Sequence, residues 1–115
     1  MRKLKSSTIL RKALELLSGG HWCKHLMAQN KNGESVDILA ETAHKFCAIG
    51  AINATNGGYL MEDLDGHGRV SSYVYNMLPF GYYSISGFND APEIKFADVR
   101  KVFNAAIAAA KRVGD

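Results

Sequence analysis

Hydrophobic residues recur at helical spacing in the first part of the chain. Apolar side chains lie three and four positions apart from Ile9 to Leu17, and residues 6–8 (Ser-Ser-Thr) precede them with hydroxyl oxygens that suit a helix N-cap. Residues 18–20 (Ser-Gly-Gly) supply a stop signal. The pattern therefore predicts a helix from the serines to Leu17.

The pattern changes between His21 and Val36. Short segments of mixed polarity flank Asn32 and Gly33, a dipeptide that favours tight turns between antiparallel strands. This stretch predicts a small β-hairpin.

A second helical pattern follows Asp37, whose side chain is suited to an N-cap, and ends at the glycines of residues 56–58 (Asn-Gly-Gly). Small or apolar residues lie along one face at helical spacing: Ala43, Phe46, Cys47, Gly50, Ala51 and Ala54. We interpret Cys47 as a small hydrophobic residue. Gly50 makes the same face shallow, so that a segment of this chain or of a second copy can approach closely.

Two further helices are predicted, one over residues 70–78 that Pro79 closes, and one from about Phe96 to Val113. A glycine-containing loop separates them. We therefore expect a mainly α fold, a compact bundle of about four helices with one small β-hairpin after the first helix. Residues 1–115 would form a single domain, with residues 1–5 as a frayed basic N-terminus.

Composition narrows the class of protein. Apolar residues make up 47% and charged residues 22% of 115, and no stretch reaches the roughly 20 apolar residues of a membrane span. The basic start lacks a small-residue cleavage site, so we expect no signal peptide, a cytoplasmic location and thiols that stay reduced. Five of the first twelve residues are cationic and none is anionic, which makes nucleic acid an alternative partner.

The sequence contains candidate zinc and calcium sites, but neither matches the motif that such a site requires. Five residues would converge on a zinc ion if a strand faced the second helix, but their spacing matches no zinc pattern: His21, Cys23, His25, His44 and Cys47. Residues 63–68 open like a calcium loop but lack its acidic twelfth position, so we interpret them as a polar turn. Because no nucleophile or phosphate-binding motif is present either, we expect no catalytic residue, no metal and no cofactor.

Aromatic residues gather in the hairpin and third-helix regions, interleaved with cationic and amide side chains: Trp22, Tyr73, Tyr75, Tyr82, Tyr83 and Phe88, beside Lys24, His25, Arg69 and Asn89. Such a mixture suits a pocket for a nucleotide-like anion, a protein interface, or an ordinary core.

Three segments, "HWCKHLMAQNKNGESVD", "AHKFCAIGAI" and "GFNDAPEIKFADVRKVFNAAI", resemble a family of short uncharacterised domains from bacteriophages, prophages and bacteria. The resemblance covers about residues 6–110. Its motifs fall on Trp22, Gly33, Ala43, Cys47, Gly50, Ala51, Asn89 and Asp90. Phe88 replaces a second tryptophan, and Lys95 replaces a threonine N-cap, so that the last helix would be capped from Asp90 or start later.

The resemblance implies no catalytic residue and a phage or prophage setting. We therefore expect a non-enzymatic binding protein in the host bacterial cytoplasm that modulates a host defence system. It would sequester a nucleotide-like ligand or block a host protein, with a second copy of the chain as a further partner to consider. The residues expected to bind are Trp22, Lys24, His25, Arg69, Tyr73, Asn89 and Asp90.

Overall fold

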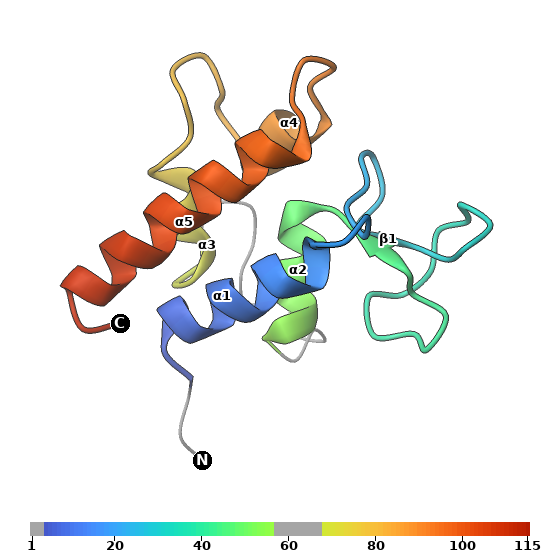
Figure 1. The fold of residues 1–115 in the computed structure, drawn as a ribbon, viewed down its shortest axis with the longest axis horizontal. Coiled ribbons are helices and arrows are strands. Elements are labelled where there is room, and N and C mark those ends of the chain that lie inside the picture. Colours follow the sequence, from blue (N-terminus) through green and yellow to red (C-terminus); the bar gives the residue numbers. More distant parts are fainter. Residues whose placement is uncertain (1–3, 57–67) are drawn as a thin grey trace.

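The computed structural model describes residues 4–56 and 68–115, which contain five helices and one two-stranded antiparallel sheet (Figure 1). The elements are α1 (Ser6–Leu17), β1 (Ala28–Gln29), β2 (Lys45–Phe46), α2 (Ala48–Thr55), α3 (Ser71–Tyr75), α4 (Ile85–Asp90) and α5 (Phe96–Arg112). The predicted fold class, mainly α with a small antiparallel hairpin after the first helix, is confirmed. Residues 1–3 and residues 63–67 of the predicted polar turn lie outside the described residues.

Helix α1 forms where the apolar pattern predicts it and buries Ile9, Leu10, Ala13 and Leu17 completely or almost completely. It packs against α5 and α2, with α5 alongside it in Figure 1. The core lies between these helices, and its largest buried side chains include Phe88 of α4 and Phe103 of α5.

The predicted N-cap of α1 is wrong. Lys5 occupies the cap position without a side-chain hydrogen bond. The hydroxyls of Ser6 and Ser7 donate instead to Asp115, at the other end of the sequence. A tertiary contact therefore replaces the local cap.

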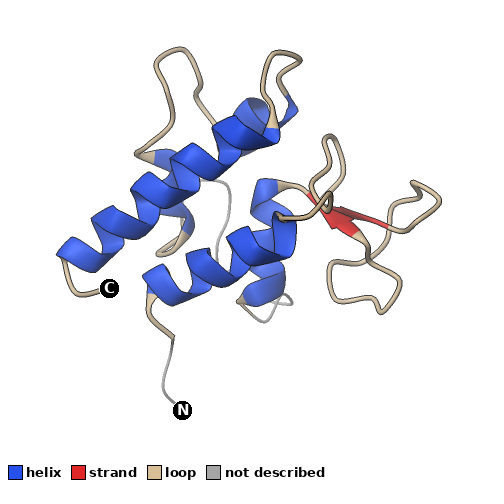
Figure 2. Cartoon of the chain, in the orientation of Figure 1, coloured by secondary structure: helices blue, strands red, loops and turns tan. Residues whose placement is uncertain are grey.

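The Asn32-Gly33 turn forms as predicted. The Gly33 amide donates to the Asn30 carbonyl over 3.0 Å, and the Gly33 φ of 82° lies in the left-handed region that glycine tolerates. Beyond the turn, Gln29 forms an isolated antiparallel bridge with Ser35. The ladder of the sheet, however, joins β1 to β2, with Ala28 opposite Phe46 (Figure 2).

The predicted start of the second helix at Asp37 is wrong, because α2 begins at Ala48. The Asp37 carboxylate caps a turn by accepting the Leu39 amide over 2.9 Å. The amides of His44 and Phe46 donate to backbone carbonyls of residues 29 and 21, so this stretch is extended rather than helical. The helical spacing of small and apolar residues in 43–47 therefore does not mark a helix. Phe46 and Cys47 are buried, but they lie in an extended segment.

Cys47 is the N-cap of α2. Its backbone is extended, and its sulfur accepts the amide of Gly50 over 3.3 Å. The side chain is buried, as predicted for a small hydrophobic residue.

Gly50 allows the close approach that its position predicts. An ideal Cβ on Gly50 would lie 2.0 Å from the carbonyl oxygen of Met27 and 2.8 Å from the carbonyl carbon. The same Met27 oxygen accepts the amide of Cys47 over 3.2 Å. The segment before β1 is therefore seated directly on the first turn of α2.

The third helix is shorter than predicted, and α4 lies in a stretch predicted to be a loop. Ser84 caps α4 by accepting the amide of Gly87 over 2.9 Å. Helix α5 begins at Phe96 as predicted, but its cap does not come from Asp90: the Asp98 carboxylate accepts the Lys95 amide over 2.8 Å. This contact is the Asp98 half of a capping box, and it satisfies the backbone amide of a lysine whose side chain does not cap the helix.

We predict that Gly50→Ala lowers the free energy of unfolding by about 3 kcal/mol, because the added methyl group would force the Met27 backbone out of position. Helix propensity alone predicts the opposite sign, a gain of about 1 kcal/mol. Urea denaturation of both proteins measures the difference. A variant as stable as the wild type, or more stable, would contradict the close approach.

Candidate functional site

Trp22 lies against the start of α5 and is fixed by a hydrogen bond to α4. Its indole Nε1–H donates to Oδ1 of Asn89 over 2.7 Å, and its ring centroid lies 6.1 Å from that of Phe96. The same Asn89 oxygen accepts the backbone amide of Ala48 over 2.9 Å. One amide oxygen thus joins the Trp22 segment to the first residue of α2.

The Asn89 side-chain nitrogen completes this arrangement. Its Nδ2–H groups donate to the carbonyl of Cys23 over 3.1 Å and to Oδ1 of Asp90 over 2.9 Å. Asn89 is 0% exposed, so an amide without partners would be costly at this position. All four hydrogen-bonding positions of the amide are used within the chain.

Lys24 and His25 extend the network to the surface. Nζ of Lys24 donates to the Ala91 carbonyl over 2.6 Å and lies 5.5 Å from the centroid of the Trp22 ring. The His25 amide donates to Oδ1 of Asp90 over 2.8 Å, which supports the left-handed φ of 73° at His25. We call Trp22, Lys24, His25, Asn89 and Asp90 the Trp22 network, which brings five of the seven predicted binding residues together.

Arg69 and Tyr73 belong to a separate group of contacts. Nη1 of Arg69 donates to Oδ1 of Asp115 over 2.6 Å, and Nη2 donates to the Leu4 carbonyl over 2.7 Å. The Tyr73 hydroxyl donates to Oδ2 of Asp115 over 3.1 Å. Sequence reasoning missed Asp115, because nothing local marks a polar residue after the last helix as a partner of the first.

Asp115 also caps α1. Its carboxylate accepts the Ser6 amide over 3.0 Å and the Ser6 hydroxyl over 2.7 Å, while its backbone carbonyl accepts the Ser7 amide over 2.8 Å. Burial by itself raises the pKa of the Asp115 carboxyl, but the hydrogen bonds from Ser6 and the charge of Arg69 outweigh burial and lower that pKa below its ordinary value. We call Ser6, Arg69, Tyr73 and Asp115 the Asp115 cluster.

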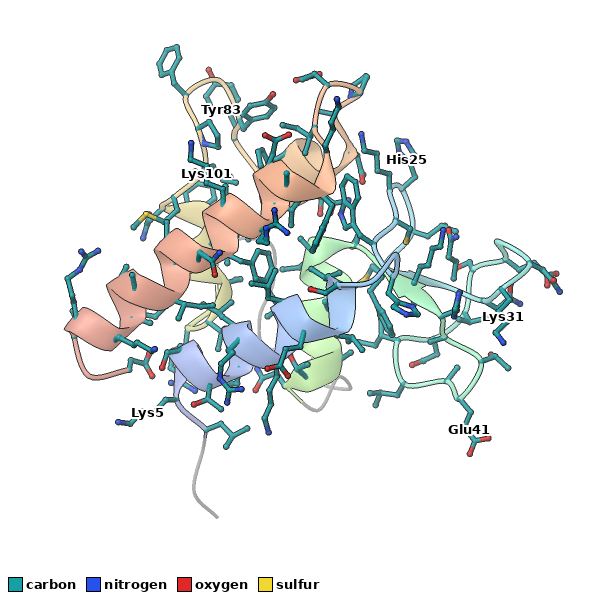
Figure 3. All side chains as sticks on the ribbon, in the orientation of Figure 1. Lys5, His25, Lys31, Glu41, Tyr83 and Lys101 are labelled. Atoms are coloured by element: carbon teal, nitrogen blue, oxygen red, sulfur yellow. The ribbon has the colours of Figure 1, made fainter. Side chains whose placement is uncertain are left out.

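A shallow pocket of about 350 Å³ lies between the turn after β1 and the turn before β2. Its lining residues are Asn30, Lys31, Asn32, Glu41, Thr42, Ala43 and His44. Partial burial and the charges of His21, Lys31 and Lys45 lower the pKa of His44 below its ordinary value. Both Lys31 and Glu41 are exposed and extend away from the body of the protein (Figure 3).

The loop between α3 and α4 carries aromatic side chains that the core does not cover. Phe80 is 102% and Tyr83 is 80% exposed, and Tyr75 at the end of α3 is partly exposed. We call residues 75–83 the aromatic loop, which extends beyond the helices in Figure 1. Sequence analysis did not select Phe80, although its place between Pro79 and Gly81 marks a turn whose side chains face solvent.

Tyr82 anchors the aromatic loop. Its ring packs edge to face on Phe88 with the centroids 5.1 Å apart, and its hydroxyl donates to the Glu93 carboxylate. This hydrogen bond raises the pKa of Tyr82 and lowers that of Glu93. The loop is therefore tied to both α4 and the segment before α5.

Within residues 4–56 and 68–115, no three His, Cys, Asp or Glu side chains lie close enough to hold a metal ion. None of the helices in these residues is both long and apolar enough to cross a membrane.

The model of a family of unknown function, DUF6197, matches residues 1–109. The chain belongs to DUF6197. No curated protein and no solved structure matches it. In this DUF6197 chain, Asn89 binds both the Trp22 indole and the Asp90 carboxylate, so these three residues are direct neighbours.

The Asp115 cluster predicts how the stability of this DUF6197 protein depends on pH. Because the folded pKa of Asp115 lies below the ordinary value of about 4, its contribution is complete above pH 5 and is lost as the pH falls from about 4 through the folded pKa. Asp115→Asn should lower the free energy of unfolding by about 1–2 kcal/mol at pH 7, the usual value of a helix cap. The two proteins should converge as the pH falls through the folded pKa of Asp115.

Chemical denaturation at a series of pH values measures this difference, with Glu41→Gln as a control that removes an exposed carboxylate. A difference between wild type and Asp115→Asn that does not change with pH would contradict the role of the Asp115 charge.

Proposed function

We propose that this chain is a non-enzymatic binding protein of the phage or prophage type, which acts in a bacterial cytoplasm by blocking a host protein. The aromatic loop is its contact surface. The observation that carries the proposal is the exposure of Phe80 and Tyr83 on a loop that other residues hold in place. Aromatic side chains dominate the binding energy of protein interfaces.

The support of the loop favours binding. Tyr82 anchors the loop through its contacts with Phe88 and Glu93. The backbone between Phe80 and Tyr83 is therefore ordered before a partner binds. A contact that is already ordered loses less conformational entropy when a partner binds. This distinguishes the aromatic loop from an unsupported surface loop with the same residues.

The shape of the surface favours a protein over a nucleotide-like ligand. The aromatic loop extends outward (Figure 1), whereas small molecules bind in concave pockets that bury most of their surface. In the Trp22 network, which was predicted to bind the ligand, the indole N–H donates to Asn89 and the Asn89 amide donates to the Cys23 carbonyl. These groups therefore bind within the chain. An outward aromatic side chain instead suits insertion into an apolar pocket on another protein.

Polar groups near the loop suit the rim of such an interface. Lys101 of α5 extends toward the side of the molecule that carries Tyr83 (Figure 3), and the charge of Asp98, one turn earlier on α5, acts on Tyr82. Interfaces commonly surround an apolar centre with polar side chains. The nucleic-acid alternative is weakened at Arg11, whose guanidinium pairs with Glu15 over 3.1 Å.

We predict that the double variant Phe80→Ser/Tyr83→Ser loses the bound partner while its thermal unfolding stays close to that of the wild type. The immobilised chain is exposed to a bacterial lysate, and the retained proteins are quantified by mass spectrometry. The double variant should retain the partner at least about tenfold less than the wild type does. Leu39→Ser, which removes a partly exposed apolar side chain outside the aromatic loop, should retain it fully.

Three results would contradict the proposal. Equal retention by the wild type and the double variant would exclude the aromatic loop as the contact. A nucleotide-sized adduct in the native mass spectrum of freshly purified protein would support sequestration instead. DNA binding that falls steeply with salt and is unchanged in the double variant would support the nucleic-acid alternative.

A further inference from the structure

The two cysteines of the chain are brought together by backbone pairing. Trp22 and Phe46 form a parallel bridge, in which the Phe46 amide donates to the His21 carbonyl over 2.8 Å and the Cys23 amide donates to the Phe46 carbonyl over 2.9 Å. In a parallel pair both chains advance together, so the next residues, Cys23 and Cys47, are cross-strand neighbours on one face. Paired strands lie about 4.8 Å apart, within the Cα separation of about 4.4–6.8 Å that a disulfide spans.

The surroundings of the two sulfurs agree with this placement. Both side chains are buried. Burial first, and then the nearby charge of a Cys47 thiolate, raise the pKa of Cys23 to about 11. Charge interaction between the two groups is expected only if they are close.

The geometry points to Cys23 and Cys47 as a redox-sensitive pair that a peroxide converts into an intramolecular disulfide. Hydrogen peroxide takes two electrons from the pair: one sulfur attacks the O–O bond and becomes a sulfenic acid as water leaves. The second sulfur then attacks that sulfenic acid and a second water leaves. Two S–H bonds and one O–O bond are broken, one S–S bond forms, and both thiol protons leave in water.

The disulfide would act as a covalent link between two segments that otherwise meet through hydrogen bonds. It would join the Trp22 segment to the residue that caps α2, and so constrain the unfolded chain over residues 23–47. The buried, high-pKa thiol of Cys23 also makes the reaction slow at neutral pH, because the thiolate is the nucleophile. The pair would therefore respond to sustained oxidation rather than to brief exposure.

The test uses the folded wild-type chain treated with hydrogen peroxide. We expect a mass loss of two hydrogen atoms, and a peptide map without reductant that joins the peptides of Cys23 and Cys47. The thermal midpoint should rise by about 10–15 °C, the shift that a disulfide of this loop length gives in a domain of this size. Dithiothreitol should reverse both changes.

Cys23→Ala is the matched control, because Cys47 keeps its capping role in this variant and the disulfide cannot form. It should show no peroxide-dependent rise in the thermal midpoint. Three results in the wild type would overturn the inference, and none needs the variant to fold: oxygen addition to either sulfur without a cross-link, a disulfide between two chains, or a cross-link that forms only in denaturant.

Discussion

The side chain of Asn89 is the interaction on which the arrangement of this fold depends most. Its oxygen accepts the Trp22 indole and the Ala48 amide, and its nitrogen donates to Cys23 and Asp90. Those partners come from the segment after α1, the start of α2 and the end of α4, which are far apart in the sequence. A fully buried amide with four satisfied hydrogen bonds requires a single relative placement of these segments, whereas apolar contacts tolerate several.

A second polar contact fixes the N-terminus of α1, whereas Asn89 binds the segment that follows its C-terminus. Asp115 supplies the N-terminal cap that α1 lacks locally and also binds Arg69 and Tyr73. Between these two polar contacts the core is mainly apolar, with Asn53 and Ser71 as further buried polar side chains, and Gly50 lets the Met27 backbone lie against α2 without an intervening side chain. The helices thus associate by burial, while Asn89 and Asp115 determine which residues meet.

Four predictions that depend on local pattern agree with the structure. The apolar spacing of residues 9–17 and 96–113, the Asn32-Gly33 turn and the small size of Gly50 each act through neighbouring residues or a single steric requirement. The start of the second helix could not be found this way, because hydrogen bonds to residues 21 and 29 hold residues 44–46 extended. Helix α4 was missed because the glycine and aromatic residues in this stretch indicate a loop. Only the Ser84 cap marks the start of the helix.

In the candidate site, too, the sequence indicates individual residues but not the contacts between distant ones. Trp22, Asn89 and Asp90 could be selected from the sequence, but not the fact that they bind one another. Arg69 and Tyr73 were grouped with them although they contact Asp115 instead. The turn residues Pro79 and Gly81 mark Phe80 as facing solvent, but composition does not reveal that Tyr82 anchors the loop through Phe88 and Glu93.

The free energy of unfolding of Asn89→Ala tests the central claim most directly, measured by urea denaturation beside Asn104→Ala, an exposed asparagine on α5. Removing the buried amide leaves the Trp22 indole, the Ala48 amide and the Cys23 carbonyl without their partner, at about 1–3 kcal/mol each. We predict a loss of about 4 kcal/mol for Asn89→Ala and less than about 0.5 kcal/mol for Asn104→Ala. Equal stability of the two variants would contradict the claim that Asn89 holds the fold together.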